Sequence, residues 1–264
     1  MAKLNFKNKW VLITGASSGL GRAIALYMAK KEYANLVVTA RRTELLEQLK
    51  TEIQSSSDSK VKIITVDLSE PKGAEDLFQK ATETADIYAV INNAGITFYG
   101  KAEVAHLDKF EKIIAVNLRA LITLSLRFLA YFEQKGAGAI LNITSEAGLI
   151  PTPFQAVYSA SKYAAQAFTE GLRLENRKSK VVISSFAPGG IATEMLTKSG
   201  LDKKHGLDSP FNMKAERAAR LAVKAFKKKK FLSVPGFMNK LMLFLVRFFP
   251  RKLVAGASEL AYRP

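Results

Sequence analysis

Residues 10–21 read WVLITGASSGLG, an apolar stretch that runs directly into a glycine-rich loop. The first five residues have the composition of a buried strand, and residues 20–31 carry apolar side chains at helical spacing. Glycine allows a tight turn and lets backbone N–H groups approach a phosphate closely. The loop glycines are Gly15, Gly19 and Gly21. A strand, this loop and a helix in succession predict a turn that binds the phosphates of a dinucleotide at a helix N-terminus.

The same alternation of strand and helix continues along the chain. Further apolar runs predict strands at Leu36–Ala40, Val61–Val66, Ile87–Ile91, Ala139–Ile143, Val181–Phe186 and Phe231–Val234. Helical patterns lie at Thr43–Ser55, Ala74–Thr84, Leu107–Asn117, Leu118–Gln134, Ser159–Asn176 and Ala215–Lys228. Such alternation with short connections gives a parallel sheet that is covered by helices on both faces. We therefore predict one doubly wound α/β domain over residues 1–264, with a mostly parallel seven-stranded sheet.

Composition excludes several classes of site. The chain has 264 residues, of which 48% are hydrophobic and 24% charged, so it can bury a full core. It contains no cysteine, which excludes a disulfide framework, a thiolate metal site and a cysteine nucleophile. Its two histidines, His106 and His205, lie far apart in sequence, and we expect no metal site. The polar first ten residues do not resemble a signal peptide, and the apolar run Leu241–Val246 is too short to span a bilayer, so we expect a cytoplasmic location.

Positive charge is concentrated in the last quarter of the chain. The formal net charge is +17, and residues 198–252 hold 15 Lys and Arg against 3 Asp and Glu. Residues 215–252 are expected to form basic amphipathic helices, in which Lys240, Arg247 and Arg251 lie off the apolar stripe. This pattern is typical of a helix docked on the protein's own core or on a partner subunit, and it also fits peripheral contact with an anionic membrane. Because no recognition motif accompanies the charge, we expect no specific nucleic-acid partner.

Two arginines follow the second predicted strand, about 20 residues beyond the glycine-rich loop. An acidic residue at this strand end would bind the ribose hydroxyls of NAD, but the chain has Arg41 and Arg42 there. A guanidinium binds a phosphate through paired hydrogen bonds, so we predict that these side chains bind the 2′-phosphate of NADP(H). The alternatives are NAD as the cofactor, and two arginines that only face solvent.

Three polar residues, Ser145, Tyr158 and Lys162, are separated by 13 and then 4 positions. A tyrosine and a lysine four residues apart on one helix face the same side. An ammonium close to a phenol stabilises the phenolate, so we expect the pKa of Tyr158 to be lowered toward neutral pH. The pair would then give a proton donor or acceptor suited to a carbonyl and alcohol couple.

Taken together, these motifs resemble those of the short-chain dehydrogenase/reductase family, whose members have a Rossmann fold. The resemblance spans residues 9–193 by motif and the whole chain by length. The matching segments, in the family's order, are Thr14–Gly21, Asn92–Gly95, Val116-Asn117, Ser145, Tyr158–Lys162, and Pro188-Gly189 with Thr193. Six motifs in one order make chance agreement negligible.

The resemblance implies a role for each matching residue. Tyr158 would exchange a proton with the substrate oxygen, and Ser145 would orient the carbonyl by a hydrogen bond. Lys162 would hold the nicotinamide ribose, and Asn117 would anchor a water that relays protons to it. The cofactor-binding residues that it implies are Gly15, Ser17, Ser18, Gly19, Leu20, Gly21, Asp67, Leu68, Asn93, Ala94, Gly95, Tyr158, Lys162, Pro188, Gly189, Ile191 and Thr193, in addition to Arg41 and Arg42.

The resemblance also implies a substrate class and an assembly. Residues 194–214 would form an apolar lid, which suits an apolar or lipid-like small molecule that carries a carbonyl or a secondary alcohol. Family members commonly pair through the helices that carry Asn117 and Tyr158, which implies a homodimer or homotetramer. The alternative is a Rossmann-fold binding or regulatory protein without turnover, and the complete set of four catalytic residues argues against it.

One residue departs from the family pattern. Glu146 follows Ser145 where many family members have a small residue. Because glutamate is seldom buried without a partner, we expect Glu146 to lie at the surface. The alternative is a contact with the substrate.

Overall fold

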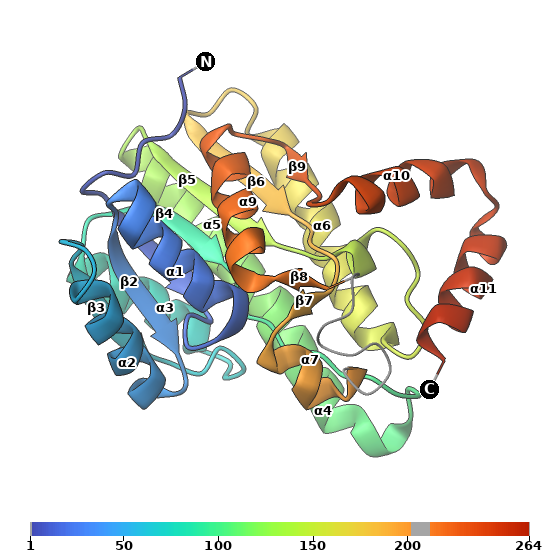
Figure 1. The fold of residues 1–264 in the computed structure, drawn as a ribbon. Helices are drawn as coiled ribbons and strands as arrows, with labels where there is room; N and C mark the ends of the chain where they lie inside the picture. Colours follow the sequence, from blue (N-terminus) through green and yellow to red (C-terminus); the bar gives the residue numbers. More distant parts are fainter. Residues whose placement is uncertain (1, 202–211, 264) are drawn as a thin grey trace.

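The computed structural model describes residues 2–201 and 212–263 (Figure 1). Seven strands form one sheet in the order β3-β2-β1-β4-β5-β6-β9, and all neighbouring strands are parallel. The strands are β1 Trp10–Thr14, β2 Asn35–Ala40, β3 Val61–Thr65, β4 Ile87–Asn92, β5 Gly138–Ile143, β6 Val181–Phe186 and β9 Leu232–Ser233. The prediction of a doubly wound α/β fold with a seven-stranded sheet is confirmed.

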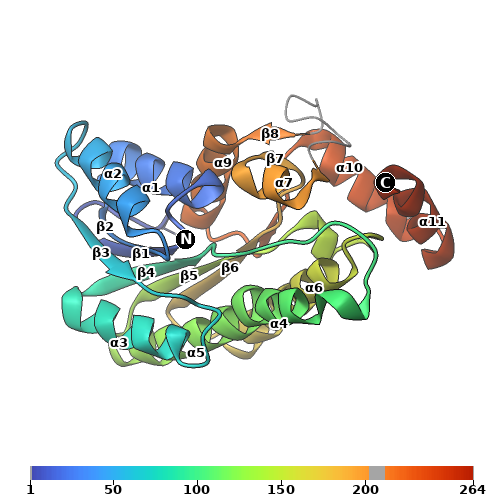
Figure 2. The ribbon, with the colours of Figure 1, turned by 90° about the horizontal axis from the view of Figure 1, so that it is seen from below.

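Helices cover both faces of this sheet (Figure 2). One face carries α1 Gly19–Glu32, α2 Thr43–Gln54 and α9 Ala215–Lys227. The other carries α3 Gly73–Thr84, α4 Leu107–Ile114, α5 Ala120–Gln134 and α6 Ala156–Glu175. The central strands are buried on both sides, which explains why their sequences are apolar without alternation. The hydrophobic core is therefore divided by the sheet into two layers.

The strand order reverses between β1 and β4, and this reversal positions the site. β1 pairs with β2 on one side and with β4 on the other, so the chain leaves the ends of β1 and β4 in opposite directions. Ligands of open α/β sheets bind at the carboxyl ends of the strands at such a point. The glycine-rich loop follows β1, Asn93 follows β4, and Ser145 follows β5, so the fold brings three motifs to one edge.

The helix that carries Asn117 is continuous, where two separate helices were expected. A π-helical turn, Ala115–Arg119, joins α4 to α5, and Asn117 is buried in it. Such a turn inserts one extra residue and rotates a side chain out of the regular helical register. The combined helix Val104–Gln134 is long and apolar enough to cross a membrane by length and composition, but half of its most apolar window is buried inside the protein.

The C-terminal quarter contains two features that were not predicted. A second sheet pairs β7 Ile191–Ala192 with β8 Met213–Lys214 in parallel, on either side of α7 Glu194–Ser199. Of the expected lid, residues 202–211 lie outside the described residues. Beyond β9, α10 Phe237–Leu245 is followed by α11 Arg251–Tyr262, and α11 had not been predicted from the sequence. We call residues 237–262 the C-terminal arm, because they extend beyond the sheet and its covering helices (Figure 1).

Candidate functional site

The glycine-rich loop is shaped to receive a phosphate group. Gly15 has φ +67°, and a Cβ atom there would lie 2.8 Å from the Cα of Ala94. Gly21 is closer still to its surroundings, because its Cβ would lie 2.3 Å from the carbonyl oxygen of Gly15. Within the described chain, no side chain caps the N-terminus of α1, and its first turn carries no acidic residue. Unpaired N–H groups and the helix dipole at this end favour an anion, so the loop fits the pyrophosphate of a dinucleotide.

Hydrogen bonds fix the loop to the end of β4. The hydroxyl of Thr14 accepts bonds from the backbone N–H groups of Asn93 (3.0 Å) and Ala94 (2.9 Å). In return, the side-chain amide of Asn93 donates to the carbonyl oxygens of Thr14 (2.9 Å) and Gly15 (3.3 Å). Asn93 therefore positions the loop, and no rearrangement of β1 against β4 is possible without breaking these bonds.

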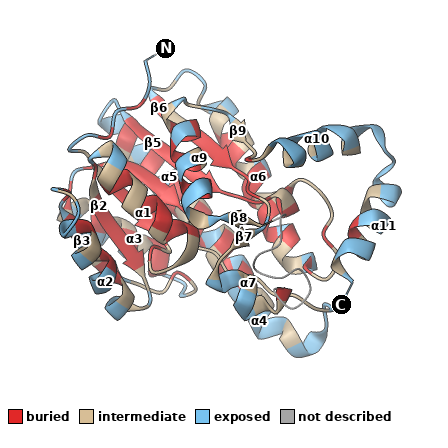
Figure 3. Ribbon diagram, viewed as in Figure 1, coloured by how far each residue is buried: buried red, intermediate tan, exposed pale blue. Residues whose placement is uncertain are grey.

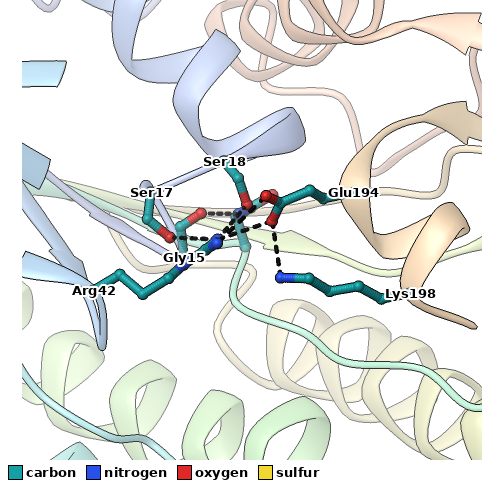
Figure 4. Close-up of polar contacts among 7 residues, drawn as sticks. Gly15, Ser17, Ser18, Arg42, Glu194 and Lys198 are labelled. Carbon is teal, nitrogen blue, oxygen red and sulfur yellow. Dashed lines mark hydrogen bonds and ion pairs between the residues drawn. The ribbon is translucent and has the colours of Figure 1, made fainter. Parts of the chain in front are cut away.

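Arg42 faces the loop, as Figure 4 shows. Its guanidinium donates to the hydroxyls of Ser17 (3.3 Å) and Ser18 (3.0 Å) and also pairs with Glu194 at 3.0 Å. Lys198 donates to the same carboxylate at 3.1 Å. Hydrogen bonds from Arg42 and Lys198 lower the pKa of Glu194 to about 2. A cluster of donors on Arg42, Ser17 and Ser18 fits a phosphate, and Glu194 is the anion that they hold in this structure.

Arg41 points to a different partner from Arg42. It lies 3.6 Å from the carboxylate of Asp67 at the end of β3, while the backbone and hydroxyl of Ser69 donate to Asp67 at 2.8 and 2.7 Å. Burial opposes the charged form of Asp67, but these bonds and the Arg41 charge hold its pKa below the usual value. The structure thus places both arginines and Asp67 where the adenosine half of a dinucleotide was expected, but each arginine has its own acidic partner.

The four predicted catalytic residues converge from three elements. Ser145 follows β5, Tyr158 and Lys162 lie on α6, and Asn117 lies in the π-helical turn. The hydroxyls of Ser145 and Tyr158 are joined by a hydrogen bond. A Cβ on Gly95 would lie 3.4 Å from Oδ1 of Asn117 and 3.6 Å from Nζ of Lys162, so both side chains flank this glycine.

Bonds to the backbone hold Lys162 and Asn117 in place. Nζ of Lys162 donates to the carbonyl oxygen of Ile143 at 3.0 Å. Asn117 exchanges two bonds of 2.9 Å with the backbone of Ile96 and donates to the hydroxyl of Ser161 at 3.0 Å. Both side chains are therefore fixed in position by partners that belong to the sheet edge and to α6.

The electrostatics of the Tyr158–Lys162 pair differ from the expectation. Burial lowers the pKa of the Lys162 ammonium to about 8. Burial also raises the pKa of the Tyr158 phenol, and the hydrogen bond from Ser145 offsets this in part. The prediction that the pKa of Tyr158 lies below its usual value is wrong for this structure, because burial raises it, and the Lys162 ammonium lies 5.9 Å from the ring centre. Tyr158 is accordingly a protonated phenol at neutral pH.

The remaining predicted residues surround this centre. The Pro188 carbonyl accepts a bond from the backbone N–H of Glu146 at 2.9 Å, and Gly189 lies beside the Glu146 side chain. Thr193 lies over Gly19, whose Cβ would be 3.1 Å from the Thr193 methyl group. Ile191 lies in β7. The side chains of Leu20 and Leu68 are buried in the core. They anchor the glycine-rich loop and the loop after β3 to it.

The expectation that Glu146 lies at the surface is wrong. The residue is half-buried, Oε1 of its carboxyl is fully shielded from solvent, and the carboxyl lies beside Gly189 and Asn239. Burial raises the pKa of Glu146 to about 7, and a hydrogen bond from Asn239 opposes this rise. Asn239 belongs to α10, and a second residue of the C-terminal arm, Tyr262, interacts electrostatically with Glu146 and Tyr158.

Sequence reasoning therefore missed Glu194, Asn239 and Tyr262. Asn239 and Tyr262 come from the C-terminal arm, and Glu194 comes from α7, which follows β7. No motif marked them, because their partners lie far away along the chain. The high density of apolar residues in 237–249 was the available signal that this segment packs on something, but it did not say on what.

Comparisons with known proteins agree with this geometry. Residues 9–204 match the family model described as short chain dehydrogenase. The chain is 32% identical over 200 residues to a very-long-chain 3-oxoacyl-CoA reductase of Anas platyrhynchos, covering 74% of this chain and 64% of that one. It is 30% identical over 194 residues to 17-beta-hydroxysteroid dehydrogenase type 3 of Homo sapiens, covering 73% and 62%. The chain thus spans less than two thirds of the length of both relatives.

A solved structure supports the same relationship over most of the chain. A short-chain dehydrogenase from Sphingobium yanoikuyae, in complex with NADPH, superposes with a TM-score of 0.80 at 27% identity. The superposition covers 92% of this chain and 96% of that one. It therefore extends beyond the segment that matches the family model.

We predict that Glu146 makes the stability of the protein depend on pH. The pKa of this carboxyl is about 7 in the folded protein against 4.5 for an ordinary glutamate, so folding favours its protonated form. Its contribution is fully present below about pH 4.5 and is lost as the pH rises to about 7. The melting temperature of Glu146→Gln minus that of the wild type, both measured by calorimetry, should therefore increase as the pH is raised from 5 to 8. Glu44→Gln, at an exposed site on α2, should show no such trend, and parallel profiles for all three proteins would contradict the prediction.

Proposed function

This chain belongs to the short-chain dehydrogenase/reductase family, and we propose that it is an NADP(H)-dependent oxidoreductase that interconverts a carbonyl and a secondary alcohol on an apolar, lipid-like substrate. The observation that carries the proposal is the convergence of Ser145, Tyr158 and Lys162 beside the phosphate-binding loop. Members of this family are NAD(P)-dependent oxidoreductases, which supports the proposed activity, while the choice of NADP(H) and the substrate class are the finer parts of the proposal.

The side chains at the centre suit reduction of a carbonyl. The bound nicotinamide supplies the hydride. The Tyr158 phenol, protonated at neutral pH, donates the proton that the substrate oxygen needs, and the Ser145 hydroxyl holds this oxygen in place. Lys162, with a pKa of about 8, is mostly cationic at pH 7 and stabilises the phenolate that remains after proton transfer. The Asn117 side chain fixes the position of the loop after β4 against α6.

The choice of NADP(H) rests on Arg42. Its guanidinium lies between the two serines of the loop and a carboxylate, which is an arrangement that a phosphate would also satisfy. A 2′-phosphate would compete with Glu194 for Arg42, whereas the neutral 2′-hydroxyl of NAD would not. The side chain of Arg41 is 64% exposed. It can bind the same phosphate if its 3.6 Å ion pair with Asp67 is broken.

The substrate class and assembly rest on the family and on the exposed surface. The two sequence relatives are named for a very-long-chain 3-oxoacyl-CoA and for a 17-beta-hydroxysteroid, and a very long acyl chain and a steroid skeleton are both large apolar groups. A homodimer or homotetramer is expected through α5 and α6, where Leu126 and Leu174 are exposed. A cytoplasmic location with peripheral contact to an anionic membrane completes the proposal.

The C-terminal arm is the surface that we assign to the membrane. Most of its residues are exposed in both helices (Figure 3), and Phe237 and Phe248 are 77% and 71% accessible. Residues 217–258 contain 11 Lys and Arg and no Asp or Glu, so this region has one sign of charge. Large apolar side chains next to basic ones are typical of a protein surface that lies in the interface of an anionic bilayer.

We predict that Tyr158→Phe abolishes reduction and leaves NADPH binding in place. Loss of the phenolic proton should lower kcat for ketone reduction by about 10²-fold or more, because general acid catalysis contributes at least that much. The measurement is NADPH oxidation with a set of ketones, from short chains to long-chain keto-lipids and steroids, together with a fluorescence titration of NADPH. Tyr163→Phe, the next tyrosine on α6, is the control and should turn over normally. Near wild-type turnover by Tyr158→Phe would refute its role.

We predict that Arg42 sets the preference for NADPH over NADH. Arg42→Ala should lower the ratio of kcat/KM with NADPH to that with NADH by about 10- to 100-fold, because a charge-assisted bond to phosphate is lost. Glu194→Gln should raise this ratio, since it removes the competing carboxylate from Arg42. Arg127→Ala, which removes an exposed arginine paired with Glu75 on the far side of the sheet, should leave the ratio unchanged. If kcat/KM of the wild type with NADH equals or exceeds that with NADPH, the NADP(H) assignment is wrong.

We predict that the wild type co-sediments with vesicles that contain phosphatidylserine and not with pure phosphatidylcholine vesicles. Phe237→Ser combined with Phe248→Ser should weaken this binding by about tenfold or more, since each ring contributes apolar burial. Tyr33→Ser combined with Val104→Ser removes exposed apolar residues outside the arm and outside α5 and α6, and should bind as the wild type does. Failure to bind at low salt, or a dimer interface formed by the arm in sedimentation velocity, would count against the membrane surface.

A further inference from the structure

Glu146 lies at the centre of the site without a role in the reaction described above. It follows Ser145 directly, in the short turn Glu146–Gly148, and its backbone N–H donates to the carbonyl of Pro188 at 2.9 Å. The main chain thus fixes its position between the end of β5 and the segment after β6. Its side chain leaves this turn toward the C-terminal arm, where it meets Asn239.

The carboxyl of Glu146 is incompletely satisfied by the protein. Oε1 is fully shielded from solvent and accepts no hydrogen bond from any of the described residues. No lysine or arginine among the described residues forms an ion pair with the Glu146 carboxyl. A buried acceptor without a donor costs free energy, so a carboxyl with a purely structural role would be expected to have both oxygens paired. The unpaired oxygen therefore points to a donor that arrives with a ligand.

Glycine at position 189 makes room for this carboxyl. A Cβ at Gly189 would lie 2.7 Å from Oε2 of Glu146 and 2.8 Å from Nδ2 of Asn239. Any side chain there would collide with both groups. The glutamate and the asparagine thus share a space that the backbone leaves open beside Pro188.

The same carboxyl is linked to the reacting centre. The phenol of Tyr262, at the end of α11, interacts electrostatically with both Tyr158 and Glu146, and its backbone carbonyl accepts a bond of 2.8 Å from the Tyr99 hydroxyl. Glu146, Asn239 and Tyr262 therefore form one polar group next to the phenol that protonates the substrate. Two of the three come from the C-terminal arm, so this polar group depends on the position of the arm.

We propose that Glu146, together with Asn239 and Tyr262, recognises a hydroxyl group on the substrate, a short distance from the carbonyl held by Ser145 and Tyr158. This rests on the proposed reductase function. A neutral hydroxyl fits best, because its O–H supplies the donor that Oε1 lacks, and the amide and phenol nearby can bond its oxygen. The substrate is then an amphipathic hydroxy-ketone, and Glu146 determines specificity while the four catalytic residues carry the reaction.

Matched ketones test this proposal. The probes are 2-decanone and the hydroxy-2-decanones whose hydroxyl lies two, three or four carbons from the carbonyl, each assayed with NADPH. The quantity compared is the ratio of kcat/KM for a hydroxy-ketone to that for 2-decanone. In the wild type this ratio should exceed one for at least one hydroxyl position. In Glu146→Leu it should fall by about 10- to 100-fold, mainly through KM, because the bond to a carboxyl is lost.

Two further variants separate recognition from structure. Glu146→Gln keeps the shape and one acceptor oxygen, so its ratio should lie between those of the wild type and Glu146→Leu. Glu44→Gln on α2 is the matched control, and its ratio should equal that of the wild type. NADPH titration and circular dichroism confirm that each variant is folded.

The outcomes separate this inference from the proposed function. If Glu146→Leu keeps the wild-type ratio at every hydroxyl position, or if an amino-ketone is preferred to every hydroxy-ketone, the hydroxyl site is wrong. A wild type that reduces 2-decanone and the hydroxy-ketones equally well overturns it too, while the reductase function stands. A wild type that binds no NADPH and reduces no ketone overturns the proposed function itself.

Discussion

The hydrogen bonds between Thr14, Asn93 and Ala94 are the constraint on which the rest of the site depends. They join the end of β1 to the end of β4 at the position where the strand order of the sheet reverses. On one side of this connection lies the glycine-rich loop with the N-terminus of α1. On the other side Gly95 brings the backbone close to Asn117 and Lys162. Together with the β1–β4 pairing, this polar connection therefore holds the glycine-rich loop next to the residues that we propose to be catalytic.

Burial is the second physical term, and it acts on the catalytic residues in one direction. Loss of hydration favours the neutral form of both the Tyr158 phenol and the Lys162 amine, so it raises the pKa of one and lowers that of the other. The pair thus holds the proton on tyrosine, and the pKa of the lysine lies at about 8. Glu146 follows the same rule, since burial shifts its pKa to about 7. On an exposed surface the charges of Tyr158, Lys162 and Glu146 would not change near neutral pH. Here burial shifts the pKa of each group away from its usual value.

How much of this could be predicted depended on the distance along the chain between interacting residues. The strands, the loop after β1 and the Tyr158–Lys162 pair were predictable, because local spacing and composition determine them. The partner of Arg42 was not, because Glu194 is 152 residues away and comes close only through the packing of α7 beside the loop. Glu146 was expected at the surface for the same reason, since the residues that cover it belong to α10 and α11. The direction of the Tyr158 pKa shift was missed because a sequence gives the charge of Lys162 and not the extent of burial.

The C-terminal arm connects the basic surface of the protein with the polar group around Glu146. Its inner side carries Asn239 and Tyr262 against Glu146, and its outer side carries exposed phenylalanines among basic residues. A segment that bound a membrane at one face and left the site untouched would not need polar residues on the other face. Since α10 and α11 are short and are joined through the turn Val246–Phe248 and Pro250, the two sides belong to one small segment. The membrane contact that we propose for the outer side and the hydroxyl recognition that we propose for Glu146 would therefore depend on the same segment, because that segment also supplies Asn239 and Tyr262.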